Sequence, residues 1–163
     1  MNAFLSQRSH RYRSFQVMFT LLSLNFLLPA LIYTLAPHQA LNSLDQLNRL
    51  MGGGPYPHLE SDSHLWRYLG AANVMTLGVM CVLLQVDLRR FYAVLWPLTF
   101  MKVYAATLWL AGFLAEPGTP VFLGAAVLDY ATSAAFVYFV TRAHRDIAAL
   151  GNGELVPRPL FSR

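Results

Sequence analysis

Four long apolar segments limit what this chain can fold into. They cover residues 15–36, 65–86, 91–114 and 120–141, and each is close to the roughly 20 residues that an α-helix needs to cross a bilayer. Of the 163 residues, 56% are hydrophobic and only 12% are charged, which is too apolar for an ordinary soluble domain. The sequence therefore predicts an all-α integral membrane protein, an antiparallel four-helix bundle in which short links join neighbouring spans.

The four segments predict one domain rather than several. Residues 1–150 form the predicted four-span transmembrane domain, with the first segment retained as a helix rather than removed as a signal peptide. Residues 151–163 contain two glycines and two prolines, which predicts a flexible cytoplasmic tail.

The basic residues are divided unequally between the two ends of the predicted spans. Nine of the twelve Lys and Arg residues fall on the side that holds both termini, whereas only Arg49 and Arg67 fall on the other side. By the positive-inside rule, both termini are predicted to be cytoplasmic and the protein to be a multi-pass component of the bacterial inner (plasma) membrane. The nine follow the turns of the chain instead of forming one patch, so no nucleic-acid partner is predicted. They are Arg8, Arg11, Arg13, Arg89, Arg90, Arg142, Arg145, Arg158 and Arg163.

An amphipathic segment, residues 41–51, lies between the first two spans. Its leucines occupy one half of a helical wheel, and polar residues including Asp45 and Arg49 occupy the other half. This pattern predicts a helix that lies flat on the outer membrane interface. It would either cover the rim of the bundle or act as a lid over an outward-opening cavity.

Two charged residues, Lys102 and Asp129, lie well inside apolar segments. Each costs roughly 2.5 to 3.5 kcal/mol to insert at the centre of a spanning helix, so the two are expected to pair. At 1.5 Å per residue, Lys102 lies about 18 Å below the outer end of its span and Asp129 about 14 Å below the outer end of its own. Two other interpretations remain: the pair only fixes helix register, or Lys102 extends to the cytoplasm from a helix that begins at Pro97.

If the charges pair, polar residues of the second and fourth spans are expected to surround them and form a binding site. The predicted site residues are Lys102, Asp129, Asn73, Thr76, Tyr130 and Ser133. No catalytic residue, metal ligand or cofactor is predicted, because the histidines all lie outside the apolar segments and no motif of a known catalytic class is present.

The layout of the chain resembles a known family. The first span ends in "LLPALIYTLAP", the amphipathic segment reads "LNSLDQLNRL", the second span opens with "WRYLGAANVMTLGV", and a short basic hairpin and two further spans follow. Over most of residues 15–141 this layout resembles the DoxX-like group of small four-helix bacterial membrane proteins. The resemblance implies a role without an assigned reaction, or that of an accessory membrane subunit associated with quinone-linked oxidoreductases. Lys102 and Asp129 do not match a signature of that group.

These observations favour a non-catalytic membrane protein that is either an accessory subunit of a larger membrane complex or a binder of a small lipophilic ligand, lipid or quinone-like. One alternative is a membrane-embedded enzyme that acts on a lipid or quinone-like substrate through Asp129 and Lys102. Another is proton or solute transport by a homo-oligomer.

Overall fold

Every element of the described chain is helical. The computed structural model describes residues 9–54 and 64–149, with side chains in the second stretch from Tyr68 onward. The predicted all-α class is confirmed for these residues, whereas the predicted flexible tail lies outside them. The elements are α2 (His10–Leu35), α3 (Pro37–Leu50), α4 (His64–Val86), α5 (Leu88–Phe91), the 3₁₀ helix η1 (Tyr92–Val94), α6 (Leu95–Ala115) and α7 (Pro120–Ala149).

Four helical stretches are long and apolar enough to cross a membrane, which matches the predicted number of spans by length and composition and suggests a membrane protein. They are His10–Leu35, Tyr68–Val86, Leu88–Ala115 and Pro120–Ala149. The helices extend beyond the apolar segments that predicted them, most clearly in α7, which continues past residue 141. The link between the second and third spans is itself helical, because the Asp87 carboxylate accepts a hydrogen bond from the Arg90 backbone N–H at 3.0 Å and caps α5.

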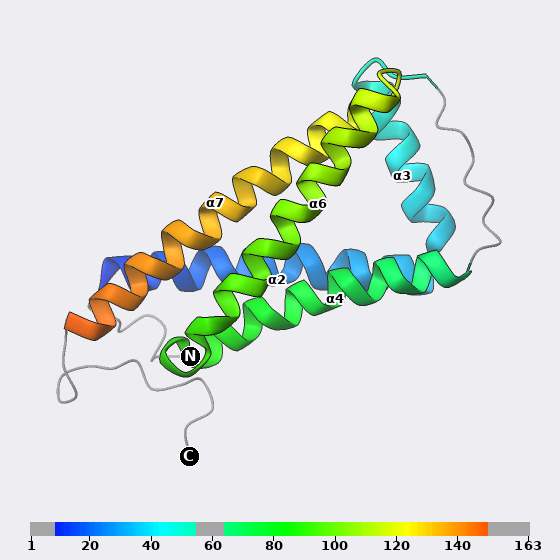
Figure 1. The fold of residues 1–163 in the computed structure, drawn as a ribbon. Helices are drawn as coiled ribbons and strands as arrows, with labels where there is room; N and C mark the ends of the chain where they lie inside the picture. The colour runs from blue at the N-terminus through cyan, green and yellow to red at the C-terminus, as the bar shows by residue number, and fades with distance from the viewer. Residues whose placement is uncertain (1–8, 55–63, 150–163) are drawn as a thin grey trace.

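The long helices form two pairs. α2 packs mainly against α4, and α6 mainly against α7. Figure 1 shows the pairs close together at one end and splayed at the other, where α3 crosses from the end of α2 to the tip formed by α6 and α7. The buried core lies at the narrow end, where Phe15 and Phe19 of α2 meet Phe136 of α7 and Leu95 and Leu98 of α6.

Polar contacts join the start of α2 to the end of α7 at the narrow end. Ser9 caps α2 through its Oγ, which accepts from the Tyr12 N–H at 3.1 Å and donates to the Asp146 carboxylate at 2.7 Å. Arg11 forms an ion pair with the same carboxylate at 3.0 Å. Arg89 donates to the Ile147 carbonyl at 2.9 Å, which satisfies a carbonyl in the last turn of α7.

At the wide end, α3 is attached to α7 through the fully buried side chain of Asn48. The Asn48 Oδ1 accepts from the Val121 N–H in the first turn of α7 at 3.3 Å, and its Nδ2 donates to the Gly54 carbonyl at 2.8 Å. Gly52 ends α3 with φ of 84°, a conformation that favours glycine. A Cβ at Gly53 would lie 2.6 Å from the Asn48 amide, so this glycine lets the backbone turn close around the side chain.

Candidate ligand site between the helix pairs

The Lys102 ammonium and the Asp129 carboxylate form an ion pair between α6 and α7. Both side chains are largely shielded, with 10% and 14% of their surface exposed. The Lys102 Nζ also lies 5.1 Å from the centre of the Phe26 ring on α2, close enough for a cation–π contact. The lysine therefore points toward α7 and α2, and it does not extend along α6 in the way that the alternative interpretation requires.

The predicted residues of α7 flank this pair but do not bind its charges. The Ser133 Oγ donates to the Asp129 backbone carbonyl at 2.8 Å, so its hydroxyl is used within the helix. Tyr130 is exposed, and its hydroxyl is hydrogen-bonded to the Thr107 hydroxyl of α6 at 3.0 Å. Ser133 thus supports the helix turn beneath the carboxylate, whereas Tyr130 links α6 and α7 on another side.

The predicted residues of α4 lie apart from the charged pair. Asn73 and Thr76 are exposed, and the Thr76 hydroxyl donates to the Ala72 carbonyl of its own helix at 2.8 Å. Within the described chain, no hydrogen bond joins either residue to Lys102 or Asp129. The reason is the arrangement of the helices, since α4 packs on α2 and diverges from the pair formed by α6 and α7.

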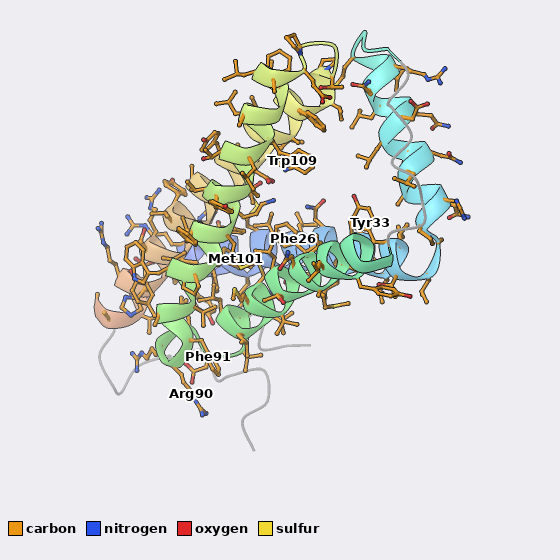
Figure 2. All side chains as sticks on the ribbon, turned by 45° about the vertical axis from the view of Figure 1, so that its right-hand side comes forward. Phe26, Tyr33, Arg90, Phe91, Met101 and Trp109 are labelled. Carbon is orange, nitrogen blue, oxygen red and sulfur yellow. The ribbon has the colours of Figure 1, made fainter. Side chains whose placement is uncertain are left out.

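Aromatic residues of α2 and α6 lie on two sides of the opening between the helix pairs, the region where the pairs splay apart. Figure 2 shows Trp109 of α6 on one side of this opening and Phe26 and Tyr33 of α2 on the other, with α3 across the wide end. Trp109 packs on Phe122 of α7 with ring centres 5.3 Å apart, and 40% of its surface remains exposed. Phe26 is almost fully buried and contacts the Lys102 ammonium, so the charged pair lies where α6 and α7 meet α2.

The sequence reasoning missed a buried polar network between α2 and α4. The Gln85 side chain accepts from the Thr20 hydroxyl at 2.8 Å and donates to the Ser23 hydroxyl at 2.9 Å. Gln16 donates to the Gln85 backbone carbonyl at 3.3 Å. The signal was present, because Gln16, Thr20 and Ser23 share one face of a helix at i, i+4 and i+7. The network satisfies its own polar groups and fixes how α2 packs on α4, so it is not a second ligand site.

No protein-family model, curated protein or solved structure matches this chain. The function therefore has to be inferred from the residues and their arrangement. The resemblance to the DoxX-like group stays a prediction.

The charged pair can hydrogen-bond a polar group without changing its own charge. An ammonium has three N–H donors, of which Asp129 occupies one, and a carboxylate has two acceptor oxygens. The remaining donors and acceptors are suited to a carbonyl or hydroxyl group carried by an apolar molecule. Among the side chains of residues 9–54 and 68–149, no group of three metal-ligating residues lies close enough together to hold a metal ion.

Proposed function

We propose that this chain is a non-catalytic integral membrane protein of the bacterial inner membrane that binds a small lipophilic molecule between its two helix pairs. The observation that carries the proposal is the shielded Lys102–Asp129 pair, which lies between α6 and α7 with the aromatic ring of Phe26 of α2 beside the ammonium. A lipid or quinone-like molecule has the matching chemistry. Its polar head would bind the ion pair, and its apolar body would contact aromatic side chains such as Trp109.

The energetics favour a ligand with both polar and apolar parts. Ligand sites in proteins are mainly apolar, with a few polar groups that fix orientation. Trp109 and Tyr33 present apolar rings, and the pair presents the polar groups. A purely apolar ligand would leave the free donors of Lys102 without partners, whereas a ligand with a carbonyl or hydroxyl oxygen would satisfy them.

The orientation proposed for the spans has the narrow end in the cytoplasm, with neighbouring spans antiparallel and α3 on the outer interface. Arginines gather near this narrow end, where α2 begins, α5 lies and α7 ends, as expected for a cytoplasmic side. The described members of this group are Arg11, Arg13, Arg89, Arg90, Arg142 and Arg145. The leucines of α3 include Leu44, Leu47 and Leu50, which are exposed in the protein and suited to contact with lipid.

Cysteine labelling tests this orientation. In a background in which the buried Cys81 is replaced by serine, Ser43→Cys on α3 and Ala148→Cys at the end of α7 place single thiols at the two ends. A membrane-impermeant maleimide added to intact spheroplasts is expected to label Ser43→Cys and to label Ala148→Cys only after lysis. The reverse pattern would contradict the proposed topology.

Trp109→Ala tests the binding proposal. Removing this ring from the wall of the opening is expected to lower the occupancy of a co-purified lipophilic molecule about tenfold, because a large aromatic contact contributes on the order of 1.4 kcal/mol. The measurement is native mass spectrometry of the protein in mild detergent, followed by extraction and identification of the bound molecule.

Trp96→Ala is the matched control, because Trp96 is on the same helix but 63% exposed and outside the contacts of the site. It is expected to keep the wild-type occupancy. Equal loss in both variants, or only a random sample of bulk lipids in the wild type, would refute a specific site. Stoichiometric capture of larger subunits with an empty opening would instead favour the accessory role implied by the DoxX-like resemblance.

A further inference from the structure

A surface cavity, separate from the Lys102–Asp129 pair, lies where α2 meets α7 at the narrow end of the fold. It has a volume of about 370 Å³, within the range of small-ligand sites. Its α2 side is a single stripe that includes His10, Arg13, Val17 and Leu21, residues that follow one another at spacings of three and four. Phe139 of α7 lines the other side, and the cavity is open to the surface of the protein.

The first turn of the stripe is cationic. Arg13 is exposed, and in the part of the chain that the structure describes it has no ion-pair partner. Asp146, near the end of α7, is engaged by Ser9 and Arg11. The guanidinium of Arg13 is therefore available to bind an anion in the cavity, and the imidazole of His10 lines the same cavity.

The stripe becomes apolar one turn further along and stays apolar to the end of α2. Val17 and Leu21 line the cavity and are 45% and 59% exposed. The same ridge continues through exposed leucines at the spacing of successive helix turns. They are Leu24, Leu28, Leu31 and Leu35.

This order of groups matches one kind of molecule. A free phosphate would bind Arg13 but would make no contact with the apolar lining residues Val17 and Leu21. A neutral lipid would leave the Arg13 guanidinium without a counter-charge. An anionic phospholipid has a phosphate at one end and acyl chains that can follow the ridge. The cavity accommodates the phosphate and the first part of one chain, and the rest of that chain would lie along the exposed leucines.

We propose that the cavity lined by His10, Arg13, Val17, Leu21 and Phe139 is a binding site for an anionic phospholipid of the cytoplasmic leaflet. The phosphate binds to Arg13 and His10, and one acyl chain lies along the apolar ridge of α2. This site does not involve Lys102, Asp129 or Trp109, so it stands independently of a ligand in the opening between the pairs.

The experiment is a titration of the purified full-length protein, in mild detergent, with dioleoyl phosphatidylglycerol and with dioleoyl phosphatidylcholine. Native mass spectrometry counts the bound lipids. The wild type is expected to prefer phosphatidylglycerol, and Arg13→Gln is expected to weaken that binding about tenfold through the loss of a charge-assisted bond to phosphate. Arg13→Lys keeps the charge and is expected to retain part of the preference.

Arg145→Gln is the matched control, since it removes an equally exposed charge at the same end but outside the cavity. It should leave phosphatidylglycerol binding unchanged, and thermal unfolding should show that all variants remain folded. Competition with inorganic phosphate shows whether the site binds a phospholipid or free phosphate. A phospholipid that is also held by its acyl chain is expected to stay bound at millimolar concentrations of phosphate. Equal binding of both lipids, an equal effect of Arg145→Gln, or displacement by phosphate would each overturn the proposal.

Discussion

Asp129→Asn is expected to destabilise the folded protein by about 3 kcal/mol, because it leaves the shielded Lys102 ammonium without its counter-charge. The loss would appear as a lower free energy of unfolding in a denaturant titration of the protein in detergent micelles. Lys102→Met/Asp129→Asn is expected to recover most of that stability, since it removes the unpaired charge as well.

The exposed pair of Asp45 and Arg49 on α3 provides a control. Its side chains are 30% and 62% exposed, so Asp45→Asn is expected to change stability by less than about 1 kcal/mol. If Asp129→Asn leaves stability unchanged, the pair does not hold α6 to α7. Lys102→Met alone completes the comparison. If the double variant loses as much stability as Asp129→Asn and Lys102→Met lose together, the two charges are not coupled.

Asn48→Ala is expected to release α3 from α7 and to cost about 2 kcal/mol, because the buried Val121 N–H and the Gly54 carbonyl both lose their partner. The effect is large for one amide because Asn48 serves as an N-cap for a helix that it does not belong to. The hydroxyl of Thr119, the residue before α7, donates to the Glu116 carbonyl at 2.7 Å, and in the described residues no N–H of the first turn of α7 donates to this hydroxyl.

Hydrogen–deuterium exchange measures the release directly. Faster exchange is expected in α3 and in the first turn of α7 of the Asn48→Ala variant, with the narrow end unchanged. Asn42→Ala is the control, because Asn42 is exposed on the same helix. Slow exchange of α3 in both variants would mean that other contacts hold this helix in place.

The four spans and the charged pair could be predicted because each depends on a strong local rule. Apolar runs of sufficient length predict spans, and two lone opposite charges in such runs predict each other. The structure brings Lys102 and Asp129 together. Phe26, the third group at the pair, could not be predicted, because it comes from a helix whose position relative to α6 is not encoded in any periodic pattern.

Asn73 and Thr76 lie apart from the pair for a similar reason. A helical wheel shows which residues share a face, but it does not show which neighbour that face meets. Two closely packed pairs that diverge leave this part of α4 exposed. Asn48 was missed because its partners, Gly54 and Val121, are backbone groups that leave no sign in a pattern of side chains.

The seam between Ser9, Arg11 and Asp146 has a consequence for how the protein is made. On a translating ribosome α2 emerges first, and the turn that carries Asp146 is among the last parts of the described chain to be synthesised. A nascent chain can assemble each helix pair before that turn appears, but it cannot close the seam. The unfinished protein should therefore stay open to insertion factors and proteases until the final turn of α7 leaves the exit tunnel.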